Sequence, residues 1–215
     1  MITVSQSEAG RASARTPDIE ARDRLVEAAR VAFGNNGFHG TTTRHIAAAA
    51  GMSPAAVYVH HPSKEALLYA LSLAGHTATL ADVTAAEASS ADPVEQVYAI
   101  VRAFVLREAE QHATARIVNY ELDALTTEHR VEIDDLRRQI QDTLQSAIER
   151  GMNSGQLDCA EPTMTAVSVM GMSIDVGRWY RDEGRWTPAE VADHHADLAL
   201  RMVGAQRGER PSRQR

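Results

Sequence analysis

The chain has 215 residues, of which 44% are hydrophobic and 24% charged, as expected for a globular protein with a sizeable core. It has no apolar run near the roughly 18 residues of a membrane span, and its N-terminal segment has no apolar secretory core, so we expect a cytoplasmic protein without a membrane partner. The one cysteine, Cys159, excludes an intramolecular disulfide framework and a cysteine-only metal cage.

The net charge of −7 is distributed unevenly along the chain. Residues 1–70 carry seven basic and six acidic side chains, whereas the remainder carries 15 basic and 23 acidic ones. This distribution argues against a protein that binds polyanions over its whole surface, but it permits a small basic head on an acidic body.

Helix-forming residues are abundant and alternating β-branched segments are scarce, so we predict an all-α fold with nine helices. A capping residue before a proline marks four helix starts, at Thr16-Pro17, Ser53-Pro54, Asp92-Pro93 and Thr187-Pro188. The predicted helices span 17–35, 42–50, 54–60, 63–87, 93–112, 113–124, 128–153, 161–183 and 188–206. We expect a flexible arm (1–16), an N-terminal three-helix domain (17–64), a C-terminal helical domain (65–206) and a flexible tail (207–215).

The sharpest signal lies between residues 42 and 60. Thr42 can cap one short helix, Gly51 can adopt the left-handed conformation that ends it, and Ser53 can cap the next helix. Two short helices joined by a tight glycine-containing turn predict a helix-turn-helix. The second helix carries only small residues on one side, Ser53, Pro54, Ala55 and Ala56, and such a face fits a major groove about 12 Å wide. The donors around it, which could hold phosphates, are Thr42, Arg44, Tyr58, His60 and Lys64.

The segment from Leu25 to Leu68 resembles the DNA-binding domain of TetR-family transcriptional regulators. The residues that carry the resemblance are Phe33, Gly37-Phe38, Thr41-Thr42, Ile46-Ala47, Ala50-Gly51, Ser53, Tyr58, His60, Ser63-Lys64-Glu65 and Leu67. It implies that Arg44 reaches the DNA, that Ser53, Ala55 and Ala56 face base edges, and that Tyr58, His60 and Lys64 hold phosphates. The sequence departs from the family at His61, where an aromatic residue usually packs against the first helix. A core role, which we favour, and a pH-sensitive role both remain open there.

The same resemblance implies a C-terminal domain for ligand binding and dimerisation. The protein would then be a homodimer, formed through the last two helices, that binds a palindromic double-stranded operator as a repressor and is released by a ligand. We place the pocket between the fourth and eighth helices, with the candidate lining residues Val101, Phe104, Ile117, Tyr120, Leu136, Ile140, Met170 and Ile174. An apolar lining of this kind favours a hydrophobic small-molecule effector. The dimer strip predicted on the helix 161–183 consists of Ala166, Val169, Met170, Ser173, Ile174 and Gly177.

The segment 177–181 places two arginines and two aromatic residues on about one helical turn. Arginine beside a flat aromatic ring can hold a phosphate and stack a purine. The patch is similar to one in TetR-like repressors that respond to acyl-coenzyme A thioesters, and this similarity adds Arg178 and Trp179 to the candidate ligand-binding residues. A solvated helix end, and a different class of ligand, both remain open.

The sequence contains no group of residues arranged for catalysis. Cys159 has no histidine near it in the sequence, and Asp193, His194 and Asp197 do not converge on one helix face. We therefore expect no enzyme activity, no cofactor and no metal site. The alternative function is a helical dimeric scaffold without sequence-specific DNA binding, which the acidic body favours slightly and the complete helix-turn-helix opposes.

Overall fold

The computed structural model describes residues 17–205, and within this range the secondary structure is entirely helical. The predicted arm 1–16 lies outside the described residues, as does the predicted tail 207–215. The elements are α1 (Pro17–Gly40), α2 (Thr43–Ala49), α3 (Pro54–His60), α4 (Lys64–Ala88), α5 (Pro93–Glu110), α6 (His112–Tyr120), the 3₁₀ helix η1 (Leu122–Ala124), α7 (Thr127–Asn153), α8 (Pro162–Ile174), α9 (Val176–Trp179) and α10 (Pro188–Met202).

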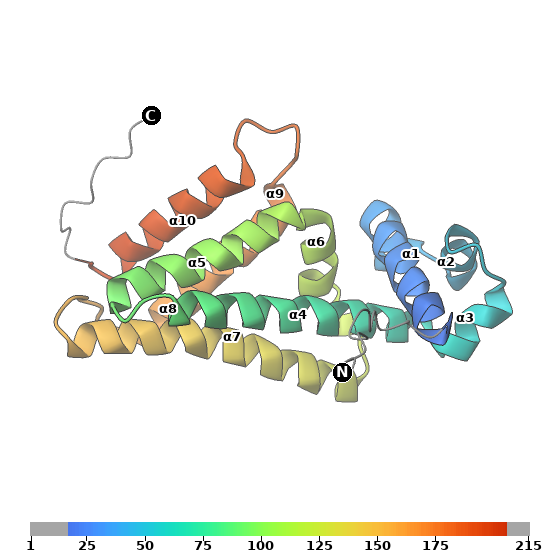
Figure 1. The fold of residues 1–215 in the computed structure, drawn as a ribbon, viewed down its shortest axis with the longest axis horizontal. Coiled ribbons are helices and arrows are strands. Elements are labelled where there is room, and N and C mark those ends of the chain that lie inside the picture. The colour runs from blue at the N-terminus through green and yellow to red at the C-terminus, as the bar shows by residue number, and fades with distance from the viewer. Residues whose placement is uncertain (1–16, 206–215) are drawn as a thin grey trace, which may run out of the picture.

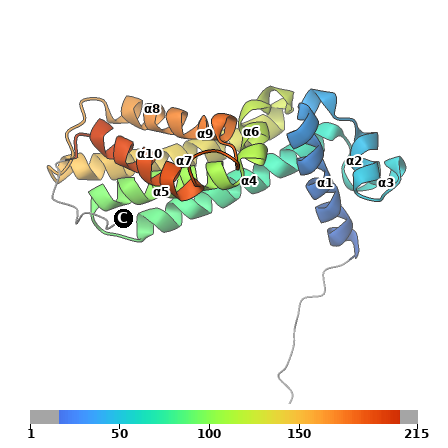
Figure 2. The same ribbon diagram turned by 90° about the horizontal axis from the view of Figure 1, so that it is seen from above.

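The helices form two groups that α4 connects. The short helices α2 and α3 pack with α1 at one end of the molecule, and α5, α7, α8 and α10 form a bundle at the other (Figure 1). The long α4 begins beside the first group and continues into the bundle, and the view from above shows the same arrangement (Figure 2). Within the bundle α10 packs along α5, and α4 packs along α5 and α7.

The predicted helix starts rest on local chemistry that the structure confirms. The side chain of Ser53 accepts a hydrogen bond from the backbone N–H of Ala56, and Asp92 accepts one from Val94. Thr187 and Glu190 form a complete capping box at the start of α10. Thr16, the remaining predicted cap, lies outside the described residues.

Two hydrophobic clusters stabilise the fold. One fills the bundle, from Val83 on α4 to Val203 after α10. The other joins α1, α2 and α3 to residues 67–71 of α4, to Ile117 and Val118 of α6, and to Ile133 of α7. The second cluster therefore crosses the predicted boundary between 17–64 and 65–206, so the N-terminal helices are packed firmly onto the bundle. The boundary itself stays a prediction.

The predicted helix 161–183 differs from the observed structure. It divides into α8 and α9, and Tyr180 then adopts an extended backbone with φ −61° and ψ 144°. This change of direction buries the Tyr180 ring, which meets the His112 ring edge-on at 5.5 Å. Burial of a large aromatic ring outweighs the few helical hydrogen bonds that a continuous helix would add.

The predicted dimer strip on this helix needs a correction. Ala166, Val169, Met170 and Ser173 are buried within the subunit, because they face α5 and α7. The apolar residues that α8 leaves exposed are Met164 and Val167, with exposed fractions of 67% and 50%. The periodicity identified an apolar face, but sequence alone did not show which partner covers it.

One helix of the described chain, α4, is long and apolar enough by composition to cross a membrane, with a mean hydropathy of 1.2 over its most apolar window. It lies in the middle of the fold and packs against α1, α5, α6 and α7. We therefore interpret its apolar residues as protein core, since Leu67, Leu68 and Val83 are fully or almost fully buried between these neighbours.

Candidate DNA interface and ligand cavity

Helices α2 and α3 form the predicted helix-turn-helix. Thr42 caps α2 by accepting a hydrogen bond from the backbone N–H of His45 at 3.2 Å. Gly51 follows α2 with φ 67°, the left-handed conformation that a residue with a Cβ rarely adopts. Buried Ile46, Ala47 and Val57 attach the two helices to α1, so the opposite face of α3 points outward.

The outward face of α3 matches the one predicted from the sequence. Ser53, Pro54 and Ala55 are exposed, and Ala56 is half-buried. Tyr58 is 54% exposed, and its hydroxyl lies 3.1 Å from the Thr43 hydroxyl of α2. This surface is free of bulky side chains over its first turn, so another macromolecule can approach its backbone closely.

Among the described residues near this surface, Arg44 on α2 is a cation that is accessible to a ligand. Its side chain is exposed, and no residue of the described chain holds its guanidinium group. Thr42 is also exposed, but its hydroxyl oxygen already serves as the cap of α2. A contact from Arg44 to a phosphate would therefore not disrupt the fold.

His60 and Lys64 are turned toward the protein. The His60 side chain is only 13% exposed, and its Nδ1 lies 3.0 Å from a carboxylate oxygen of Asp18 on α1. Lys64 donates hydrogen bonds to the backbone carbonyls of Phe38 at 2.8 Å and Thr41 at 2.9 Å. Its ammonium group also lies 4.2 Å from the centre of the Phe38 ring. Lys64 thus holds the end of α1, and its predicted contact with DNA has at most one N–H left to serve it.

His61 is half-buried beside α1, which agrees with the core role that we favoured. Burial lowers the pKa of His61, and the positive charge of Arg22 lowers it further. Its Nε2 is buried and has no hydrogen-bond partner in the structure. The neutral ring therefore packs where the family usually has an aromatic residue.

A cavity of about 340 Å³ lies between α4, α5, α6, α7 and α8, the helices between which the pocket was predicted. Phe104, Ile140, Met170 and Ile174 line it, as predicted. The other predicted ligand residues lie elsewhere. Val101 is buried in the bundle core, and Ile117 and Leu136 belong to the cluster beneath α1.

The predicted arginine and aromatic patch also lies outside this cavity. Arg178 is close to Asp175, at 3.4 Å, and to the ring of Tyr120, whose centre is 5.2 Å away. Trp179 is 42% exposed and stacks on His195 of α10, with ring centres 6.2 Å apart. Arg178 and Trp179 therefore make separate contacts at the surface, and neither lines the cavity. A role for them in ligand binding stays a prediction.

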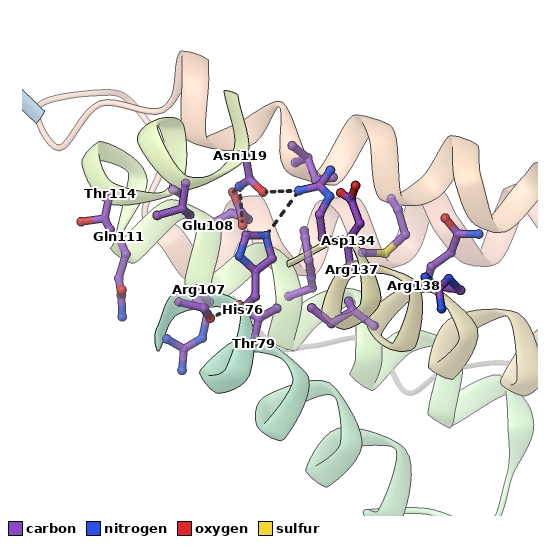
Figure 3. A pocket seen from close by; sticks show the side chains of 18 residues that line it. His76, Thr79, Arg107, Glu108, Gln111, Thr114, Asn119, Asp134, Arg137 and Arg138 are labelled. Atoms are coloured by element: carbon purple, nitrogen blue, oxygen red, sulfur yellow. Dashed lines mark hydrogen bonds between the residues drawn. The ribbon is translucent and has the colours of Figure 1, made fainter. Parts of the chain in front are cut away.

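The cavity is far more polar than the sequence predicted, and a chain of hydrogen bonds crosses it (Figure 3). His76 on α4 bonds the Ser72 carbonyl through Nδ1, so Nδ1 carries the proton and Nε2 is an acceptor. Arg137 on α7 donates to that Nε2 at 3.3 Å and to the side-chain oxygen of Asn119 at 2.9 Å. Asn119 on α6 in turn donates to the Glu108 carboxylate of α5, at 3.2 and 3.3 Å.

Burial sets the charge state of this network. Burial raises the pKa of Glu108 to about 8, against the opposing effects of Asn119, Arg137 and Arg107. Burial also lowers the pKa of His76 to about 4. Near pH 7 Glu108 is mostly protonated and His76 is neutral, which leaves Arg137 as the charged member of the four.

Sequence reasoning missed these four residues because each lies on a different helix. His76 and Glu108 left a signal in the sequence. His76 falls on the apolar face of α4, four residues after Ser72, and Glu108 falls on that of α5, four residues after Phe104. A polar group in such a position needs a buried partner.

The outward-facing α3 and the cavity between the helices of the bundle are typical of a helix-turn-helix DNA-binding regulator with a ligand-binding domain. Residues 25–71 match the family described as "Bacterial regulatory proteins, tetR family", and residues 90–203 match "Tetracyclin repressor-like, C-terminal domain". The chain therefore belongs to the TetR family of transcriptional regulators, which confirms the family and the fold predicted from its sequence.

Known relatives are similar over most of the chain. The HTH-type transcriptional repressor KstR2 of Mycobacterium tuberculosis is 28% identical over 186 residues, which are 83% of this chain and 90% of that one. A TetR-family regulatory protein from Rhodococcus RHA1 is 38% identical, with 87% of this chain and 99% of that chain covered and a TM-score of 0.84. AibR, in a complex with isovaleryl coenzyme A and operator DNA, is 27% identical, with 86% and 100% covered and a TM-score of 0.77.

Proposed function

We propose that this regulator is a repressor that binds a palindromic operator as a homodimer and is released by a small molecule in the cavity. The observation that carries the proposal is the exposed face of α3, which Pro54 begins and which small side chains leave open to a major groove. Arg44 and Tyr58 stand beside this face with their polar groups accessible, so they could contact phosphates.

The exposed apolar residues of α8 and α10 support the homodimer. Met164 and Val167 on α8 are exposed, and so is Met202 on α10, at 41%. Gly171, also exposed, would allow a second helix to approach α8 closely. Binding to a palindromic operator requires that the two-fold axis of this dimer set two copies of α3 on successive major grooves, about 34–36 Å apart.

The contacts of the helices that line the cavity support release by a ligand. Both α4 and α6 line the cavity and also pack against α1, the helix that carries the helix-turn-helix. Arg116 of α6 donates a hydrogen bond to the Gly34 carbonyl of α1 at 3.0 Å. A ligand that binds better to one arrangement of α4 and α6 would change the spacing of the two heads, and operator affinity with it.

We propose that the ligand is a small molecule with an apolar part; the sequence predicted a hydrophobic effector, with an acyl-coenzyme A thioester as the finer prediction. The AibR structure, which contains isovaleryl coenzyme A, supports a thioester. A volume of about 340 Å³ is at the small end of ligand pockets, so the cavity could hold an acyl group but not a whole coenzyme.

Binding of the full-length protein to the duplex upstream of its own gene, measured by fluorescence anisotropy across a salt series, tests the proposed function. We expect site-specific binding that weakens steeply with salt and is absent on a scrambled duplex. Ala55→Glu, on the outward face of α3, should abolish it, because a carboxylate would meet the DNA. Ala85→Glu, at an exposed position of α4 in the bundle, is the matched control and should bind normally. A folded dimer that binds no duplex would favour the scaffold instead.

A further inference from the structure

The lining of the cavity combines apolar and polar side chains. Phe104, Ile140, Met170 and Ile174, from α5, α7 and α8, are apolar. The polar lining includes His76, Asn119, Glu108, Asp134 and three arginines, Arg107, Arg137 and Arg138 (Figure 3). A molecule that fills this space therefore meets both polar and apolar groups.

Two of these three arginines already have an anionic partner. Arg107 donates to the carboxylate of Asp82 at 2.6 Å, and Arg138 donates to Asp135 at 2.8 Å. Arg137 differs from both. Its hydrogen-bond partners, His76 and Asn119, are neutral groups, and no carboxylate of the described chain forms an ion pair with it.

The two carboxyl groups near Arg137, those of Asp134 and Glu108, do not form an ion pair with it. Asp134, one turn earlier on α7, is held by Arg130 at 2.8 Å. Glu108 contacts the same asparagine as Arg137, but burial raises its pKa to about 8 and so keeps it mostly protonated near neutral pH. Arg137 is thus a partly buried cation near the charge of Asp134 but in direct contact with no carboxylate, and such a group gains from an anion that pairs with it.

The guanidinium group of Arg137 is also incompletely hydrogen-bonded. Both of its hydrogen bonds use Nη1, so Nε and Nη2 have no protein acceptor in the part of the chain that the structure describes. A guanidinium group presents its donors as a planar fork that matches the two oxygens of a carboxylate. The shape of the vacant donors therefore fits a carboxylate better than a single carbonyl oxygen.

We propose that the effector is an amphipathic carboxylate, whose two oxygens pair with Arg137 and whose apolar tail lies against Phe104, Ile140 and Met170. This inference rests on the proposed function, since it takes the occupant of the cavity to be the effector. Protonated Glu108 adds to the same site, because its O–H can donate to a carboxylate oxygen. The carbonyl group of a thioester and the hydroxyl group of an alcohol are neutral, so neither group would form an ion pair with Arg137 at this position.

Direct binding to the full-length protein without DNA tests the inference. The probes are the unbranched carboxylates of six, eight, ten and twelve carbons, each compared by calorimetry with the alcohol and the coenzyme A thioester of the same chain length. We expect at least one carboxylate to bind about 30-fold or more tightly than its alcohol and its thioester, as for a buried charge pair compared with an unpaired one. The comparison needs no variant, so it does not depend on whether a variant folds.

Substitutions then assign the binding to Arg137. Arg137→Met should weaken binding of the carboxylate about 30-fold or more and change binding of the alcohol little, whereas Arg137→Lys should recover part of the loss. Arg138→Met is the matched control, because this arginine lines the same cavity but is 62% exposed and paired with Asp135. Its affinity for the carboxylate should stay within about threefold of the wild type, as for an exposed ion pair.

Three results would overturn the inference. They are the absence of binding by every carboxylate, equal or tighter binding of the alcohol or thioester, and a carboxylate affinity that Arg137→Met leaves unchanged. None of these results bears on operator binding, which the anisotropy experiment measures separately. A protein that binds its operator and prefers the thioester would retain the proposed function and lose only the carboxylate.

Discussion

Lys64 offers a direct test of whether a residue of the head acts on DNA or on the fold. Lys64→Met keeps most of the aliphatic length and removes the ammonium group. The change deletes two hydrogen bonds from a charged donor, to the carbonyls of Phe38 and Thr41, and the contact with the Phe38 ring. Each hydrogen bond to a charged group contributes about 1.5–3 kcal/mol, and the freed carbonyls can partly turn to water. We therefore expect a loss of about 2–4 kcal/mol in the free energy of unfolding.

Thermal unfolding at a fixed protein concentration measures this loss. For a chain of this size each kcal/mol lowers Tm by about 2–4 °C, so a fall of about 5–15 °C is expected. Operator affinity of the folded variant, measured well below its Tm, should fall by less than about tenfold, because the ammonium group has little capacity left for a phosphate. An unchanged Tm with a large loss of operator affinity would refute this reasoning and establish Lys64 as a DNA contact.

Arg44→Ala should weaken operator binding about tenfold and reduce the salt dependence by about one counterion without changing Tm, which anisotropy across a salt series would reveal. Gly51→Ala should destabilise the protein by about 1–2 kcal/mol, because alanine is strained at φ 67°; unfolding by urea would measure this, and an unchanged midpoint would contradict it. Burial raises the pKa of Glu108 from 4.5 to about 8, so its contribution to stability is full below pH 4.5 and falls as the pH rises through 8. Glu108→Gln should remove this decline in stability between pH 6.5 and 8. The buried His76, whose pKa is lowered from 6.5 to about 4, affects the pH dependence of stability mainly below this window.

The features that sequence predicted well are those that neighbouring residues determine. The caps at Ser53 and Thr187 involve partners three residues away, and the turn at Gly51 depends on one backbone conformation. The helix-turn-helix could be predicted for the same reason, since its two helices and its turn lie within nineteen residues, 42–60. The helix break after Ile174 could not be predicted from the sequence, because it depends on the buried position that Tyr180 takes against His112.

The polar residues of the cavity show the opposite limit. His76, Glu108, Asn119 and Arg137 come from four helices, so their contacts with one another depend on how those helices pack. His76 and Glu108 lie on the apolar faces of their helices, but the sequence does not show which polar partners they meet there. Sequence patterns count apolar residues on a face, so they located the cavity between the correct helices and recovered Phe104 and Ile140, but they described its lining as apolar.

The position of Val118 explains how a ligand in this cavity could reach the DNA-binding head. Val118 lines the cavity, and it also belongs to the hydrophobic cluster that holds α1. The next residue, Asn119, connects Arg137 to Glu108. A carboxylate that paired with Nε and Nη2 of Arg137 would pull on the guanidinium group that Asn119 contacts through Nη1, and any resulting shift of α6 would move Val118 within the α1 cluster. Since packed clusters have few intermediate arrangements, a small displacement at the cavity could favour a second position of the head. On this argument the ligand acts through α6 as well as through the long α4.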